Sequence, residues 1–231
     1  MLKKLPNNDT LRAILLHALL AAVSLFINGF GIHLTIRANI GAGPWDVLNL
    51  GLSKAFGILY GNVSVIVSAT VILVDLLLRE PIGIAIFIDA LVVGKSVDFF
   101  NFLDFIHTPR TVVGKIVMML LGLAVIGYTQ ATYMWASLGC GPRDTLLLGM
   151  KRRIKRIPIG VVEIDLLAVV TMLGYVLGGP VGIGTLIFAF AAGPIMQFAF
   201  HTLRFDAMQV QHQKIHETVR VFARGKQNDV E

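Results

Sequence analysis

The chain has 231 residues, of which 55% are hydrophobic and 15% are charged, and its formal net charge is +6. A soluble domain of ordinary composition carries about 25% charged residues, and here the apolar residues form runs long enough to cross a bilayer. These figures exclude an ordinary soluble domain. Because the basic residues lie between and after the apolar runs, the positive charge indicates membrane topology rather than nucleic-acid binding.

Six apolar runs are expected to form transmembrane helices, since lipid offers the backbone no water to bond with. They cover residues 11–36, 58–78, 81–103, 112–137, 159–177 and 181–203. The expected fold is therefore an all-α integral membrane protein with about six transmembrane helices. Basic residues concentrate before the first run, between the fourth and fifth, and after the last. The positive-inside rule then predicts that both termini are cytoplasmic.

Two short motifs each occur twice along the chain. The first reads Gly-Ala-Gly-Pro-Trp-Asp at 41–46 and Gly-Cys-Gly-Pro-Arg-Asp at 139–144, and the second begins at Pro81 and again at Pro180. Chance does not easily repeat both motifs at matching distances, so they indicate an internal duplication. Each copy would hold three spans, and an odd number of spans reverses the direction of the chain.

The duplication therefore predicts two inverted three-helix repeats, at 1–103 and 104–203, followed by a polar cytoplasmic tail at 204–231. Inverted repeats are a common plan for secondary transporters, which bind solute near the midplane where the repeats meet.

A short helix is expected after each copy of the first motif. Pro44 and Pro142 suit the first position of a helix, where the missing N–H is no loss. The stretch at 44–56 would be about 20 Å long, which is too short to span a bilayer. It is either a re-entrant half-helix whose start dips toward the midplane or an interfacial helix that lies flat.

The two motifs supply the candidate substrate-binding residues. They are Gly41, Gly43, Pro44, Asp46, Asn49, Gly139, Gly141, Pro142, Arg143 and Asp144. Two helix starts that approach each other favour an anion, whereas a carboxylate near each start caps its own helix and favours a cation or a proton. The sign of the solute charge stays open. Arg143, which replaces Trp45 in the second copy, is either a solute contact or one more charge on the cytoplasmic side.

Ionisable residues within apolar spans are costly and should face the protein interior or water. The candidates for coupling or gating are Asp89, Lys95, Asp98, Glu163 and Asp165. Lys95 and Asp98 have the i, i+3 spacing of a helical ion pair.

Asp75 and Arg79 are expected to pair near the bilayer surface at the end of the second span. Cys140 is the only cysteine, and no cluster of cysteine and histidine has the spacing of a metal site. No cofactor is expected.

The motif N-x-G-x-G-P-W-D at 39–46 resembles the YczE-like bacterial membrane proteins, which are related to the wider YitT group. The resemblance covers nearly the whole chain, including the second copy of the motif. It implies a location in the bacterial cytoplasmic membrane and the same repeat layout. It transfers no substrate and no catalytic residues.

The predicted function is a transporter or channel for a small, charged solute, with the site near the midplane between the repeats. Asp46 and Asp144 would form its core, and Asp89 would couple or gate it. The alternative is a membrane protein that anchors or assists a partner assembly without transport. An enzyme is not expected, because no nucleophile and base occur at usable spacing. The expected partners are the solute and the lipid bilayer, and a chain this small suits a homodimer.

Overall fold

The computed structural model describes residues 11–136, 141–154 and 156–203. This part of the chain is built from helices and loops, without a strand. The helices are α1 (Leu11–Arg37), α2 (Pro44–Phe56), α3 (Tyr60–Leu77), α4 (Ala85–Leu103), α5 (Val112–Trp135), α6 (Pro142–Arg153), α7 (Ile159–Val176) and α8 (Ile183–Thr202). The all-α prediction is therefore confirmed for the described residues. The predicted tail at 204–231 lies outside them.

Five of the described helices, α1, α3, α5, α7 and α8, are long and apolar enough to cross a membrane. They correspond to five of the six predicted spans. The remaining predicted span contains α4, which has 19 residues but carries the charged residues Asp89, Lys95 and Asp98. These three charges set α4 apart from the other long helices.

The eight helices form two series of matching lengths. α1 and α5 have 27 and 24 residues, and α2 and α6 have 13 and 12. α3 and α7 both have 18, and α4 and α8 have 19 and 20. Each series therefore runs long, short, long, long, with a proline at the start of its short helix.

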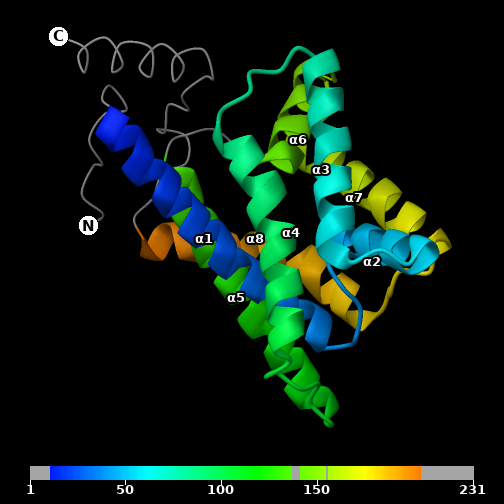
Figure 1. Cartoon of the computed structure of the whole chain (residues 1–231). Helices are drawn as coiled ribbons and strands as arrows, with labels where there is room; N and C mark the ends of the chain where they lie inside the picture. The colour runs from blue at the N-terminus through cyan, green and yellow to red at the C-terminus, as the bar shows by residue number, and fades with distance from the viewer. Residues whose placement is uncertain (1–10, 137–140, 155, 204–231) are drawn as a thin grey trace.

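The helices pack in two groups, which Figure 1 shows side by side. In one group α1 lies against α4 and α5, and α5 lies against α8. In the other group α2, α3, α6 and α7 form a ring, in which α2 packs on α7 and α3 packs on α6. The two groups join where α3 packs along α4. The ring contains both short helices, so it brings the two copies of the motif together.

Small residues let α1 and α5 approach closely. A Cβ atom added to Gly31 would lie 2.9 Å from the carbonyl oxygen of Gly122, and one added to Gly122 would lie 2.7 Å from the carbonyl oxygen of Gly31. Nearby, the Asn28 side-chain amide donates a hydrogen bond of 2.9 Å to the Thr129 hydroxyl. Such glycine contacts and buried polar pairs are typical of helix association in lipid, where burial of apolar area contributes little.

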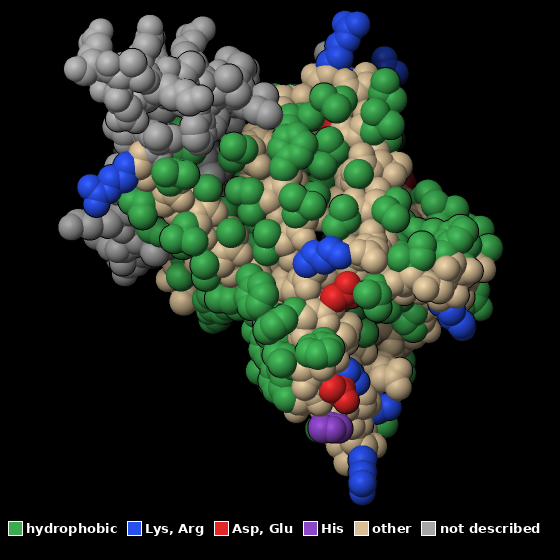
Figure 2. All heavy atoms as spheres, viewed as in Figure 1, with side chains coloured by type: hydrophobic (Ala, Val, Ile, Leu, Met, Phe, Trp, Pro, Cys, Tyr) green, Lys and Arg blue, Asp and Glu red, His purple; other side chains and the backbone are tan. Residues whose placement is uncertain are grey.

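Large apolar side chains remain exposed along the long helices. Leu19 on α1 is 62% exposed, Leu77 on α3 is 75% exposed, and Phe190 on α8 is 79% exposed. Figure 2 shows hydrophobic side chains spread over most of the visible face, with few charged groups between them. A surface of this kind is suited to contact with lipid tails rather than with water.

Candidate functional site

The two short helices begin in the same way, each with a glycine in extended conformation followed by proline. Gly43 precedes Pro44 at the start of α2, and Gly141 precedes Pro142 at the start of α6. The predicted short helix at 44–56 is confirmed with these bounds. Neither start is capped by a side chain of its N-cap residue, because both N-cap residues are glycine. The first N–H groups of both helices are therefore available to other partners.

The segment before α2 runs beside the start of α8. The carbonyl of Ile40 accepts a 2.7 Å hydrogen bond from the N–H of Gly184, and the N–H of Ala42 donates to the carbonyl of Pro180 at 3.3 Å. Gly41 has a φ of +113°, which favours glycine, and a Cβ there would lie 2.8 Å from the nitrogen of Gly182. The glycines of the first motif thus permit a non-helical backbone to pass close to another helix.

The starts of α2 and α6 meet through Trp45 and Arg143, which hold the same position in the two copies of the motif. The guanidinium carbon of Arg143 lies 5.2 Å from the ring centroid of Trp45, which is the geometry of a cation–π contact. Arg143 is half-buried, unlike the exposed Arg152 and Arg153 at the other end of α6. No ion pair within 4 Å involves Arg143 in the described part of the chain.

Two aspartates of the motifs bind side chains from other helices. Asp46 is 3% exposed, and its Oδ1 accepts a 2.7 Å hydrogen bond from the hydroxyl of Tyr60, the first residue of α3. The amide nitrogen of the buried Asn49 lies 3.4 Å from the same hydroxyl. Asp144 accepts a 3.1 Å hydrogen bond from the side-chain amide of Gln130 on α5. Both carboxyl groups are therefore held by neighbouring helices.

Asp89 brings α4 to the start of α6. A Cβ atom added to Gly141 would lie 2.8 Å from Oδ2 of Asp89, so the Asp89 carboxyl group lies directly against the residue that precedes α6. The charge of Arg143 acts on Asp46, Asp89 and Asp144. The charge of one guanidinium is thus felt by three carboxyl groups that come from three different helices.

The electrostatics of the two motif aspartates are set by burial. Burial raises the pKa of Asp46, while the charge of Arg143 and the hydrogen bond from Tyr60 oppose that rise. Burial also raises the pKa of Asp144, and the charge of Arg143 again opposes it. Both carboxyl groups therefore bind a proton more readily than an exposed aspartate does. This arrangement can hold a charged group or exchange a proton.

A sequence profile of a known family matches residues 15–201, which include both copies of the motif. This chain belongs to DUF6198. DUF6198 is described as a family of unknown function, so membership brings no activity with it.

Relatives of this DUF6198 protein occur in two bacteria. It is 32% identical to the membrane protein YczE of Bacillus subtilis, over 76% of its own length and 81% of YczE. It is 33% identical to a protein of Haemophilus influenzae, over 76% of its length and 79% of that protein. It is 29% identical to YyaS of B. subtilis, over 75% of its length and 87% of YyaS. No solved structure matches the chain.

These comparisons confirm the resemblance to YczE-like proteins. With the apolar helices described above, they identify this DUF6198 chain as a membrane protein.

The DUF6198 site gathers most, but not all, of the residues that the sequence suggests. Gly139 lies outside the described residues. Glu163 is exposed on α7, although its charge acts on Asp144, and Asp165 is exposed two residues further along α7. Asp165 therefore has no described connection to the motif residues.

The predicted pair of Lys95 and Asp98 is wrong, because both residues bind α3 instead of each other. Oδ1 of Asp98 accepts a 2.9 Å hydrogen bond from the N–H of Gly61, and Nζ of Lys95 lies 2.5 Å from the side-chain oxygen of Asn62. The i, i+3 spacing allowed a pair on α4, but the first turn of α3 offers free N–H and amide groups that take both partners. These contacts close α3 against α4.

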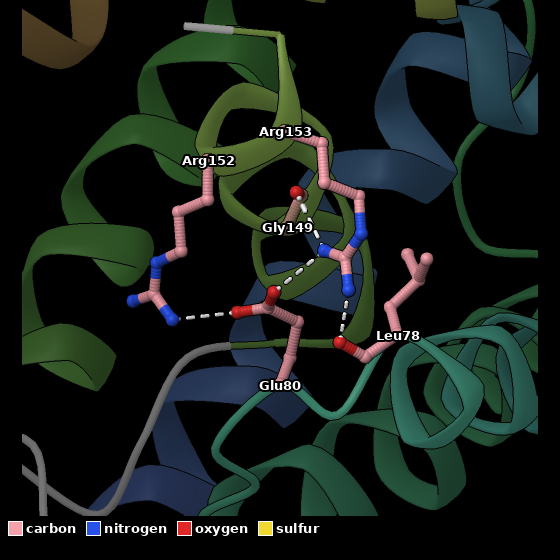
Figure 3. Close-up of polar contacts among 5 residues, drawn as sticks. All are labelled: Leu78, Glu80, Gly149, Arg152 and Arg153. Carbon is pink, nitrogen blue, oxygen red and sulfur yellow. Dashed lines mark hydrogen bonds and ion pairs between the residues drawn. The ribbon is translucent and has the colours of Figure 1, made fainter.

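A second ionic cluster, which the sequence analysis missed, ties α6 to the loop between α3 and α4 (Figure 3). The Glu80 carboxylate pairs with Arg152 at 2.7 Å and with Arg153 at 3.0 Å. Arg153 also donates to the carbonyls of Gly149, at 2.9 Å, and of Leu78. The basic residues after the second motif were interpreted only as a sign of membrane topology, and the sequence does not indicate that two of them pair with Glu80.

The predicted pair of Asp75 and Arg79 is wrong as well. Asp75 is fully buried on α3, and neither of its carboxylate oxygens has a hydrogen-bond partner among the described residues. Arg79 is exposed and has a left-handed φ of +55°, because the helix ends before it. The sequence spacing assumed a helix that continues to Arg79.

Proposed function

We propose that this DUF6198 protein is a membrane transporter for a small, charged solute, which it binds where the starts of α2 and α6 meet. The observation that carries the proposal is the half-buried Arg143, which contacts Trp45 and whose charge acts on Asp46, Asp89 and Asp144. Charged residues within a bilayer are costly and are kept mainly where they contact solute, ions or protons.

The proposed architecture is a pair of inverted repeats, α1–α4 and α5–α8. The repeated motifs, the matching helix lengths and the matching contacts all support it. The packing of α1 on α4 corresponds to that of α5 on α8, and the packing of α2 on α7 corresponds to that of α6 on α3. With α4 as a sixth span, each repeat crosses the membrane three times and the second repeat is inverted.

In this arrangement α2 and α6 are re-entrant half-helices whose starts point toward each other near the midplane. The burial of Asp46 and Asn49 supports a re-entrant rather than an interfacial position for α2, because an interfacial helix would turn its polar face to water. The basic residues at the end of α6 support a cytoplasmic location for both termini in a bacterial inner membrane.

The proposed site offers both signs of charge to a solute. Arg143 and the uncapped N–H groups of α2 and α6 suit a carboxylate or another small anion. The three aspartates suit a cation or a proton that moves together with the solute. Because burial raises the pKa of Asp46 and Asp144, a proton is the coupling ion that these two groups favour.

Flux measurements in proteoliposomes test the proposal. The wild-type chain, Asp46→Asn and Asp144→Asn are compared with small anions, cations and amino acids, with and without a pH gradient. Asp104→Asn serves as a matched control, because Asp104 is an exposed residue at the end of α4. We expect flux of at least one solute in the wild type and the control, and its loss in both motif variants.

Flux that survives in Asp46→Asn and Asp144→Asn would remove the aspartates from the pathway. The absence of flux with every solute, from protein that remains monodisperse, would contradict transport. It would favour a membrane protein that anchors or assists a partner assembly.

A further inference from the structure

The two halves of the chain differ at one contact where their sequences are alike. In the first half, Gly61 on α3 meets Gly94 on α4: a Cβ atom on Gly94 would lie 2.9 Å from the carbonyl oxygen of Gly61. The corresponding residues of the second half are Gly160 on α7 and Gly193 on α8, as the motifs beginning at Pro81 and Pro180 align them. A Cβ atom on Gly160 or on Gly193 would meet nothing within 4 Å.

Polar contacts reinforce the difference between the two helix pairs. The α3–α4 contact is closed by the hydrogen bond from the Gly61 N–H to Asp98 and by the contact of Lys95 with Asn62. The residue that corresponds to Asp98 is Gln197, which is exposed on α8. Its side-chain oxygen could accept from the Gly160 N–H as Asp98 accepts from Gly61, but the helices lie too far apart for this contact.

The α7–α8 pair is splayed from the loop that joins the two helices. α3 packs along α4, whereas α7 and α8 diverge in Figure 1 and make few contacts. An open pocket of about 520 Å³ lies between them, lined by apolar residues such as Leu167, Tyr175 and Leu186 of the two helices and by Pro44. Because Pro44 is the first residue of α2, this pocket lies against the start of that helix.

We infer that α7 and α8 close in a second conformation, in which Gly160 contacts Gly193 as Gly61 contacts Gly94 here, and that α3 and α4 separate in exchange. In that conformation α8 itself fills the space that now separates it from α7. Small residues at equivalent positions of two helices allow this close approach, and the exposed Gln197 supplies the acceptor that the closed pair needs.

This inference rests on the proposed function and deepens it. With both termini cytoplasmic, Gly61 and Gly94 lie in the outer half of the membrane, and Gly160 and Gly193 lie in the inner half. In the described conformation the outer contact of α3 with α4 is then closed, and the corresponding inner contact of α7 with α8 is open. The second conformation reverses both gates, so the site is reached from one side at a time. That behaviour defines a carrier rather than a channel.

Cysteine cross-linking in proteoliposomes tests the exchange. Gly160→Cys and Gly193→Cys are combined in a Cys140→Ala background, in which residue 140 becomes the alanine found at the corresponding Ala42. Both glycines have open space, so the described conformation accommodates the cysteines. A disulfide requires the two Cα atoms to come within about 7 Å. We expect oxidation to form it within one chain, seen as loss of maleimide labelling at monomer mass.

A second substitution shifts the population of the two conformations. Gly94→Val prevents the α3–α4 contact, since a Cβ on Gly94 already lies 2.7 Å from Cβ of Ser64. Asp98→Ala is the milder variant, which removes the acceptor of the Gly61 N–H. Each should speed disulfide formation several-fold. Leu91→Val, at a 58% exposed position of the same helix, is the matched control and should leave the rate unchanged.

The outcomes separate this inference from the proposed function, because cross-linking needs no solute. A disulfide between chains, seen when the two single-cysteine variants are mixed, would assign the gap to a subunit interface and overturn the inference. The inference would also be overturned if no variant formed the disulfide, or if Gly94→Val and Asp98→Ala left the rate of disulfide formation unchanged. Solute flux without such a disulfide would support the transport proposal and contradict the exchange of helix contacts. A disulfide without flux would support the exchange of helix contacts and leave the transport proposal without support.

Discussion

Replacement of Glu80 by glutamine removes the anion that holds the end of α6 against the loop between α3 and α4. The Glu80 side chain is 5% exposed, whereas those of Arg152 and Arg153 are 58% and 46% exposed. A hydrogen bond to a charged group contributes about 1.5 to 3 kcal/mol, and the arginines regain water when the carboxylate is lost. We therefore expect the free energy of unfolding of Glu80→Gln to fall by about 2 to 3 kcal/mol, which is less than the sum of two separate hydrogen bonds to a charged group.

The pair of Arg37 with Asp104 provides the comparison, because its side chains are 29% and 61% exposed. Exposed pairs contribute about 0 to 1 kcal/mol, so Asp104→Asn should lose at most that amount. Both variants can be compared with the wild type by SDS-induced unfolding of the purified chain and by thermal midpoints in detergent. Equal losses in Glu80→Gln and Asp104→Asn would refute the reasoning that burial makes the Glu80 cluster the stronger contact.

Three further changes probe other parts of the fold. Gly174→Ala should lower the free energy of unfolding, followed by thermal melting, by about 1 to 3 kcal/mol, because the new Cβ would lie 2.5 Å from the backbone nitrogen of Leu48. Gly193→Ala has open space around its Cβ and should leave the stability unchanged. Asp75→Asn should raise the free energy of unfolding by on the order of 1 kcal/mol, and with it the thermal midpoint, since it removes a buried charge without a described partner; a lower midpoint would reveal a missing partner. Burial raises the pKa of the Asp46 carboxyl group above its value in the unfolded chain, so the folded chain binds a proton there more tightly. Protonated Asp46 therefore favours the folded state at acid pH, and this stabilisation is lost as the pH rises through the raised pKa. Asp46→Asn should therefore flatten the fall in thermal midpoint as the pH rises above about 4, and an unchanged slope would contradict this assignment.

The helices could be predicted from the sequence because lipid leaves the backbone so few alternatives. Five apolar runs became helices suited to span the membrane, and the proline and length of 44–56 correctly gave a short helix. The sixth run differs because its three charges belong to contacts with other helices: Asp89 lies against the start of α6, and Lys95 and Asp98 bind α3.

The partners of polar residues could not be predicted in the same way. Tyr60, which binds Asp46, is the first residue of α3, and Gln130, which binds Asp144, lies in the last two turns of α5. A polar residue within an apolar run is a signal that could have singled out Gln130. Spacing along one helix favoured pairs such as Lys95 with Asp98, but the choice of partner depends on how neighbouring helices pack, which spacing does not contain.

The contact of Arg143 with Trp45 has a consequence for how the two halves diverged. Tryptophan in both copies of the motif would leave Asp46, Asp89 and Asp144 without the cation that acts on all three. Arginine in both copies would bring two guanidinium groups face to face and remove the ring that receives one of them. Neither half can therefore build this centre with a copy of itself. If the halves arose by the proposed duplication, an ancestor assembled from two identical subunits would have lacked this centre, whereas a single chain with both halves carries one tryptophan and one arginine in every molecule.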